Sequence, residues 1–282
     1  MCTLVMLRRP EARWPLLVAA NRDELETRPW KPPARHWPDR PEVVAGKDMT
    51  AGGAWFGVND DGLVVAVLNR PGTLGPADGK RSRGELVLEA LDHAEARLAA
   101  EALSDLNPES YRPFNLVIAD RYDAFWLRHA GSSASLRIRM PGGVWREIEP
   151  VHTAAVRAFS PSSTDVPVVP EIVCRPIPSG LSMITAQDLN DPTSPLIRNN
   201  LPRFRTAHPP DPARGDWAGW IEILGDRAAS DGNPKNAMNV ADAGAFTTVC
   251  SHLLALPAIG EPVMRFAAGR PDDTPFEPVD LT

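Results

Sequence analysis

Short apolar runs alternate with polar turns that carry proline or glycine along most of this chain. Residues 2–7 and 14–20 are apolar runs on either side of a polar turn that contains Pro10, and this arrangement predicts a β-hairpin. A second hairpin is predicted where Asp-Asp-Gly separates residues 51–59 from residues 63–68. The first part of the chain is therefore expected to form antiparallel strands.

The rest of the chain combines another hairpin with two helical stretches. Residues 115–119 and 124–127 flank a polar turn and predict the third hairpin. Ser82 opens a predicted helix that extends to about residue 100, and a second helix is predicted over residues 216–229 from apolar residues at helical spacing. The predicted fold class is α+β with antiparallel sheets, in one domain that covers residues 1–282.

The remaining segments have weaker patterns. Residues 247–256 are predicted to be a late strand, with residues 263–267 as its partner. Residues 28–42 contain five prolines and are expected to be a surface loop with Trp30 and Trp37. Residues 131–175 are interpreted as short strands and loops.

Composition and charge narrow the function classes. The chain has 30 Lys and Arg against 36 Asp and Glu, a formal charge of −6, which argues against a broad nucleic-acid surface. No apolar run approaches the roughly 18 residues that cross a bilayer, so no membrane span is expected. The apolar stretch at residues 3–7 is too short for a signal peptide, and we expect a cytoplasmic location.

The three cysteines, Cys2, Cys174 and Cys250, form neither a disulfide framework nor a Cys-x-x-Cys metal pair. We expect Cys174 and Cys250 to be small buried residues. Cys2 is different, because removal of Met1 would leave a residue with both a thiol and a free α-amine. An α-amine with a pKa near 8 can accept the thiol proton as a general base. The simpler alternative is that Cys2 only begins an apolar strand.

A polar cluster, Asn21-Arg22-Asp23-Glu24, ends the second apolar run. The predicted hairpin brings Arg22 near Cys2, where its charge would favour a thiolate. Asp23 or Glu24 would accept a hydrogen bond from the α-amine and orient it. A solvated turn is the commoner fate of such a cluster.

Two other groups of side chains have types that occur in catalytic or binding sites. Cys250 and His252 share one face of the predicted late strand, and we interpret them as core residues rather than a catalytic dyad. Trp55 and the other early tryptophans either line an apolar cleft beside Cys2 or belong to the core. The histidines lack metal-ligand spacing, so we expect neither a metal site nor a cofactor.

Five ordered motifs make the chain resemble the NRDE family. They are residues 1–4, 20–24, 52–59 with 68–69, 82–86 and 114–120. This family in turn resembles the N-terminal-nucleophile hydrolases of the choloylglycine hydrolase and penicillin V acylase type. The resemblance implies a four-layer αββα sandwich in which Cys2 is the nucleophile and its α-amine the base. It also implies that Asn69, at the end of the Gly-Leu to Leu-Asn segment, donates to the oxyanion.

The sequence departs from the hydrolase pattern at several positions. In the hydrolases an Arg and an Asp are separated by two residues, whereas Arg22 and Asp23 are adjacent here, and Asn21 and Glu24 have the hydrolase spacing. Which pair fills these positions stays open. A later Asn that helps to bind the oxyanion in the hydrolases has no clean counterpart here, where Gly180-Leu181-Ser182 is followed by Met183 and only later by Asn190. Near the C-terminus, Phe-Thr-Thr at residues 246–248 replaces the Gly-Thr-Arg of many relatives.

The leading hypothesis is an amidohydrolase or acyltransferase that acts on a small-molecule amide through a thioester at Cys2. We assign catalytic roles to Cys2, Arg22, Asp23 and Asn69, and substrate-binding roles to Asn21, Glu24, Trp55 and Asn190. The alternative, implied by the NRDE resemblance, is a non-enzymatic protein that binds and traffics haem or acyl-CoA and other lipids. In that case the Cys2 thiolate could ligate haem iron. The pattern does not assign an oligomeric state.

Overall fold

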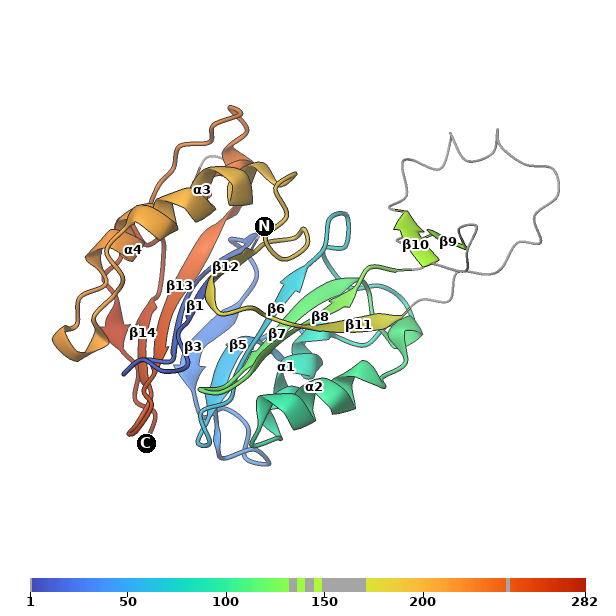
Figure 1. Ribbon diagram of the computed structural model, residues 1–282, viewed down its shortest axis with the longest axis horizontal. Coiled ribbons are helices and arrows are strands. Elements are labelled where there is room, and N and C mark those ends of the chain that lie inside the picture. The colour runs from blue at the N-terminus through green and yellow to red at the C-terminus, as the bar shows by residue number, and fades with distance from the viewer. Residues whose placement is uncertain (1, 132–135, 140–144, 149–170, 242–243) are drawn as a thin grey trace.

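Two antiparallel sheets face each other in the molecule (Figure 1). The computed structural model describes residues 2–131, 136–139, 145–148, 171–241 and 244–282. In the first sheet, the six strands in spatial order are β12 (Gly180–Ile184), β1 (Thr3–Arg8), β2 (Leu16–Leu25), β13 (Phe246–Leu256), β14 (Val263–Ala267) and β15 (Glu277–Pro278). The first and last parts of the chain therefore pair directly in one sheet.

The second sheet has seven strands and is built mainly from consecutive hairpins. In spatial order they are β11 (Ile172–Pro176), β8 (Ala124–His129), β7 (Phe114–Ala119), β6 (Val64–Asn69), β5 (Ala54–Asn59), β4 (Val43–Asp48) and β3 (Trp30–Ala34). A separate pair is formed by β9 (Leu136–Arg139) and β10 (Trp145–Ile148). The three hairpins predicted from the sequence are all present, with their strands paired antiparallel.

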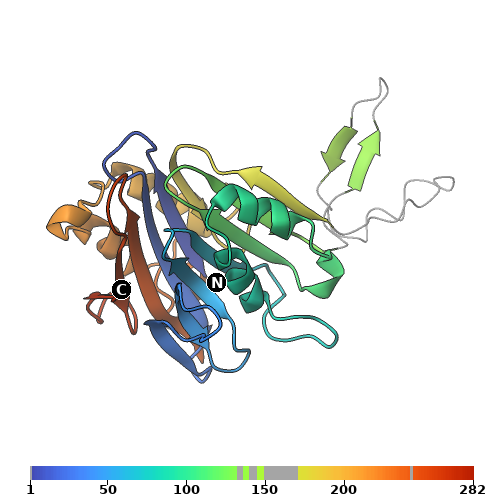
Figure 2. The same ribbon diagram turned by 90° about the horizontal axis from the view of Figure 1, so that it is seen from below.

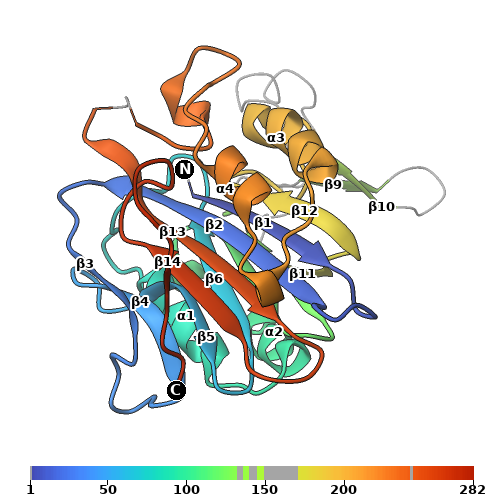
Figure 3. The ribbon, with the colours of Figure 1, turned by 90° about the vertical axis from the view of Figure 1, so that its left-hand side faces the viewer.

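Helices cover the outer face of each sheet, as Figures 2 and 3 show. On the seven-stranded sheet lie α1 (Arg83–Leu91) and α2 (Ala96–Ser104), and on the six-stranded sheet lie α3 (Pro195–Thr206) and α4 (Ala218–Leu224). Three apolar layers result: one between the sheets and one beneath each pair of helices. The structure therefore confirms the α+β class with antiparallel sheets and the four-layer αββα order.

Strict alternation along β2 decides which side chains reach the space between the sheets. Val18 and Ala20 belong to the apolar layer between the sheets, whereas Leu17 and Ala19 belong to the layer under α3 and α4. Successive side chains of a strand point to opposite faces. The polar residues that follow Ala20 continue this alternation, which splits the Asn-Arg-Asp-Glu cluster into two pairs.

A close backbone contact fixes the start of α1 against the β4–β5 turn. A Cβ atom at Gly53 would lie 2.5 Å from the carbonyl carbon of Gly84, so only glycine fits there. Ser82 caps the helix by accepting the Gly84 N–H at 3.2 Å. The Gly-Gly and Ser-Arg-Gly motifs of the sequence therefore meet in space.

Several predicted boundaries were wrong. The helix predicted from Ser82 to about residue 100 is two helices, and the Asp120 carboxylate accepts the Ala96 N–H at 2.8 Å where the second begins. The loop predicted over residues 28–42 contains β3, an edge strand that tolerates consecutive prolines because its register shifts between Lys31 and Ala34. The helix predicted over residues 216–229 is only the seven-residue α4.

Other elements escaped the sequence pattern. Helix α3 begins at Pro195 behind the N-cap Ser194, and β4, β11 and β12 were not predicted as separate strands. Much of the segment 131–175 lies outside the described residues. Cys174, expected to be buried, is exposed on the edge strand β11, whereas Cys250 is buried as expected. Among the described helices, none has the length and apolar character needed to cross a bilayer.

Candidate active site

Cys2 lies immediately before β1, at the end of the space between the two sheets. Thr3 pairs with Asn21, so the next position in the antiparallel register places Cys2 opposite Arg22. The thiol is half-buried, and its Sγ donates to the backbone carbonyl of Asp23 at 3.7 Å. The N-terminal hairpin therefore brings together the thiol and the guanidinium that the sequence placed 20 residues apart.

A narrow groove, partly open to solvent, begins at Cys2. Its walls are mostly apolar and come from both sheets: Leu4, Ala20, Phe56, Ala66, Val67 and Leu68. Arg22, Trp55 and His252 supply most of the polar side-chain groups of the lining. Only about 20 Å³ of this space can be reached by the centre of a water-sized sphere, so the groove is narrow and holds about one water molecule.

Arg22 is buried and held in position from two sides. Its guanidinium carbon lies 4.1 Å from the centre of the Trp55 ring, a cation–π contact in a desolvated setting. Its Nη2 approaches the carboxylate of Asp48 at 3.5 Å and that of Glu24 at 4.0 Å. These contacts fix the positive charge beside Cys2, and the substrate-binding roles of Trp55 and Glu24 stay predictions.

Asp48 was missed at the sequence level. Burial opposes ionisation of this carboxylate, but the Arg28 Nε–H at 2.6 Å and the N–H groups of Thr50 and Ala51 hold its pKa below the ordinary value. Asp48 therefore stays ionised and anchors both Arg28 and Arg22. Its signal in the sequence was only a single acidic residue before a Gly-Gly turn.

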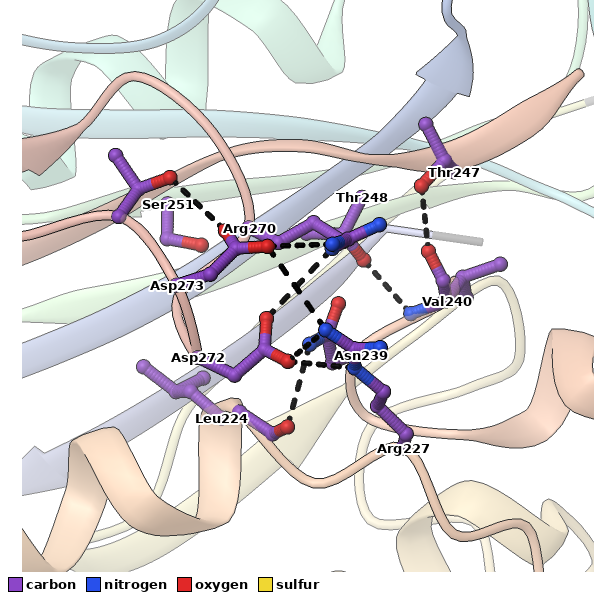
Figure 4. Close-up of polar contacts among 12 residues, drawn as sticks. Leu224, Arg227, Asn239, Val240, Thr247, Thr248, Ser251, Arg270, Asp272 and Asp273 are labelled. Atoms are coloured by element: carbon purple, nitrogen blue, oxygen red, sulfur yellow. Dashed lines mark hydrogen bonds and ion pairs between the residues drawn. The ribbon is translucent and has the colours of Figure 1, made fainter. Parts of the chain in front are cut away.

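Asp23 lies on the other face of β2, where the helices pack. The hydroxyl of Thr248 accepts the Val240 N–H at 2.9 Å and therefore donates its own proton to Asp23, at 2.6 Å. Figure 4 shows Val240 held between Thr247 and Thr248 of β13. Burial raises the pKa of Asp23. The Phe-Thr-Thr departure from the family pattern thus supplies the hydroxyl that orients this carboxylate.

Burial raises the pKa of the Cys2 thiol, and the negative charge of Asp23 raises it further. The neighbouring Arg22 acts in the opposite direction but more weakly. The thiol is consequently protonated at neutral pH. Any nucleophilic chemistry at Cys2 needs a base that removes this proton during the attack.

His252 on β13 also lines the groove, although the sequence suggested only a core residue. Its Nε2 accepts the Trp55 Nε1–H at 3.0 Å, which places the ring proton on Nδ1. Burial lowers the pKa of His252 to about 3, so the ring is neutral. The ring stacks on Phe56 with centroids 4.6 Å apart. His252 thereby fixes Trp55, which in turn supports Arg22.

The three predicted asparagines have different environments. Asn21 faces the helices: its Nδ2 donates to the carbonyls of Leu224 and Met238, and its Oδ1 accepts from Ser251. Because these bonds occupy the side-chain amide, only the backbone of Asn21 can line the groove. Asn190 has a positive φ of 56° and binds β12 through Met183 and Ser182. Asn69 ends β6 next to the groove-lining Leu68. Ligand contacts by the three asparagines stay predictions.

Within the described ranges, no group of three or more His, Cys, Asp or Glu side chains has an arrangement that would hold a metal ion.

Comparison with solved structures gives similarities over nearly the whole chain at low identity. An N-acylethanolamine-hydrolyzing acid amidase ortholog from Caenorhabditis elegans is 13% identical, with a TM-score of 0.49 over 91% of this chain and 94% of that one. Penicillin V acylase from Agrobacterium tumefaciens is 12% identical, with a TM-score of 0.41 over 97% and 93%. A conjugated bile acid hydrolase from Clostridium perfringens is 10% identical, with a TM-score of 0.49 over 100% and 98%. These values assign no substrate and no residue role to this chain.

Sequence comparison gives the family. A search of curated proteins finds no match. A family model described as Transport and Golgi organisation 2 matches residues 1–158, which include Cys2, the Asn-Arg-Asp-Glu cluster, the Gly-Gly turn and the start of α1. The match covers more than half of the chain and all but the β13 side of the groove. The chain therefore belongs to the Transport and Golgi organisation 2 family.

Proposed function

We propose that this protein is an N-terminal-nucleophile amidohydrolase or acyltransferase that attacks a small-molecule amide with Cys2. The observation that carries the proposal is the position of the Cys2 thiol, at the end of an apolar groove and opposite the buried Arg22. A thiol at this position can meet an amide carbonyl that approaches from the open side of the groove, and an acyl chain would enter between the sheets only if lining side chains move. Arg22 would stabilise negative charge that develops on the thiol sulfur or on the substrate.

The proposed reaction begins after removal of Met1, when the α-amine of Cys2 becomes free. This amine takes the thiol proton while Sγ attacks the carbonyl carbon, and a tetrahedral oxyanion forms. The ammonium then returns the proton to the amide nitrogen as the C–N bond breaks, which leaves a thioester on Cys2. Water or an acceptor amine finally attacks the thioester, with the α-amine again as base.

The raised pKa of the Cys2 thiol fits this scheme. A thiol that is protonated in the resting state gains reactivity only when a base lies beside it, and an α-amine has a pKa near neutrality. Asp23, oriented by Thr248, is proposed to accept a hydrogen bond from the amine. Asn69 is proposed to donate to the oxyanion from the end of β6.

Cys2→Ala and Cys2→Ser variants test the proposal against a panel of N-acyl amides of increasing chain length. Both should lose turnover by about 10³-fold or more while keeping the unfolding temperature of the native chain, since the nucleophile is lost and little packing changes. The exposed Cys174→Ser is the matched control and should keep full turnover. Equal turnover of Cys2→Ala and native chain would overturn the proposal.

The ligand-binding alternative predicts another pattern with the same variants. Haem bound through the Cys2 thiolate would give a Soret shift on titration that disappears in Cys2→Ala. It would also leave every amide intact. Haem titration beside the amide panel therefore separates an enzyme from a carrier.

A further inference from the structure

Arg83, the first residue of α1, forms no ion pair with a carboxylate of the described residues. Its Nη1 donates to the Thr73 hydroxyl at 2.8 Å and to the Pro113 carbonyl at 3.0 Å, and both acceptors are neutral. Throughout the described part of the chain, no Asp or Glu comes within ion-pair distance of this guanidinium. Burial and the nearby Arg112 lower the pKa of Arg83 to about 10. Arg83 is therefore a half-buried positive charge without a counterion among the described carboxylates, which is energetically unfavourable.

The fold places this charge at the candidate active site. The Gly53–Gly84 contact fixes the first turn of α1 against the turn that precedes β5, and β5 carries Trp55 into the groove. Cys2, Glu24 and Arg28 are the electrostatic neighbours of Arg83 besides Arg112. The guanidinium does not line the groove, but it lies close enough to Cys2 for the charges of the two groups to interact.

The charges around Cys2 do not balance. Arg22 and Arg28 share the two carboxylates of Glu24 and Asp48 through four close contacts. Arg83 is the third guanidinium, and it has no partner among these carboxylates. An anion bound beside Arg83 would balance the charge of this third guanidinium.

We propose that Arg83 binds an anionic group, a carboxylate or a phosphate, of the substrate whose amide Cys2 attacks. This inference rests on the proposed function of Cys2 and adds the substrate class: an N-acyl compound with an anionic group near the scissile bond. A guanidinium suits both groups, because its N–H donors match the oxygens of carboxylate and phosphate. The neutral contacts to Thr73 and Pro113 hold the side chain in place before substrate arrives.

Two alkylating reagents of the same size test the charge preference directly. Iodoacetate carries a carboxylate and iodoacetamide is neutral, so the ratio of their rates at Cys2, measured by peptide mapping, reports local charge. A change in the thiolate fraction of Cys2 alters both rates by the same factor, so it does not alter their ratio. Arg83→Gln should lower the iodoacetate-to-iodoacetamide ratio by about threefold or more, because one nearby positive charge is lost.

Matched variants keep the test specific. Arg81→Gln removes an exposed guanidinium two residues away, one that pairs with Glu85 and Glu89, and should leave the ratio unchanged. Arg83→Lys retains the charge and should retain most of the ratio. If Arg83→Gln does not fold, Arg83→Met keeps the apolar stem and replaces it in the comparison. An unchanged ratio in the folded Arg83 variant would overturn the inference.

The unfolding temperature distinguishes phosphate binding from carboxylate binding. It also distinguishes a failure of the Arg83 inference from a failure of the function proposed for Cys2. Inorganic phosphate and glutarate are each added at constant ionic strength, and the unfolding temperature is followed in native chain and Arg83→Gln. The anion that binds should raise the unfolding temperature of the native chain and not that of the variant. This readout does not need a reactive Cys2, so an inert thiol would contradict the proposed function alone. A response to neither anion would contradict the assignment to Arg83.

Discussion

At the scale of single residues, the side chains on the two faces of β2 have different environments around Cys2. Arg22 lines the groove and supplies positive charge beside the thiol, and Glu24 approaches its guanidinium from the same face of β2. Asn21 and Asp23 face the helices, where Asn21 ties β2 to α4 and Asp23 is held by Thr248. A run of four adjacent polar residues therefore serves two separate environments.

The charge of Asp23 is predicted to suppress the reactivity of the Cys2 thiol. Asp23→Asn removes a negative charge that raises the thiol pKa, so the pH profile of Cys2 alkylation should shift to lower pH. At pH 8 the alkylation rate should rise a few-fold while amide turnover falls, because the amine loses its orienting carboxylate. Thr248→Ser keeps the hydroxyl and serves as the control. A profile that shifts upward would contradict the assigned electrostatics.

His252 is predicted to make the fold acid-sensitive. Its pKa falls from an ordinary 6.5 to about 3 on folding, so the unfolded chain binds more protons between these values. Stability should therefore decrease as the pH falls through this interval, by at most about 5 kcal/mol.

Denaturant titrations from pH 7 to pH 4 measure this effect. His252→Gln keeps an acceptor for the Trp55 N–H but cannot titrate, so its stability should change less with pH than that of the native chain. The exposed His208→Gln is the control and should behave like the native chain. Asp23, whose pKa is raised by folding, changes stability with pH in the opposite direction. This contribution is the same in all three proteins, so it does not affect their comparison. Parallel pH slopes for native chain and His252→Gln would refute the assignment.

The sequence placed Cys2, Arg22 and Trp55 near one another, and the structure brings them together. The hairpin pattern explains the first pair, since its register follows from two adjacent apolar runs. Asp48 was not found and His252 was interpreted only as a core residue, because their contacts with Arg22 and Trp55 join strands far apart in the chain. Periodicity describes which face a residue occupies and not which distant residue lies opposite.

At the scale of elements, glycines join α1 to the seven-stranded sheet. Gly53→Ala is predicted to destabilise the protein by ~1–3 kcal/mol, because the new methyl group would lie 2.5 Å from the Gly84 backbone. Gly219→Ala in α4 is the control, since its nearest neighbour would be 3.7 Å away. That change should be neutral or stabilising by up to about 1 kcal/mol. Urea unfolding of both variants provides the comparison, and equal stabilities would contradict the tight contact.

Strand hairpins were easier to predict than helix boundaries. Each hairpin is a local unit with a polar turn between apolar runs, so its elements follow from neighbouring residues. The division between α1 and α2 depends instead on Asp120, whose carboxylate accepts the first N–H of α2 from a distant turn. Helix α3 has a polar surface and a proline at position 202, which obscure its pattern.

At the scale of the whole molecule, the sandwich explains why the candidate site lies where it does. β1, β2 and β13 of one sheet and β5 and β6 of the other all contribute to the groove, although they span residues from 2 to 252. The four-layer order followed from a family resemblance, since periodicity alone gave only antiparallel sheets. The assignment of residues 1–282 to one domain stays a prediction, as does the cytoplasmic location.

The most direct test of Cys2 as an N-terminal nucleophile is the intact mass of the purified protein before and after brief iodoacetamide treatment, with peptide mapping of the modified cysteine. We predict a mass that lacks Met1 and alkylation of Cys2 ahead of the exposed Cys174 and the buried Cys250. Retained Met1 would remove the base from the mechanism. That result, or a Cys2 that stays unmodified while Cys174 reacts, would contradict the proposed chemistry.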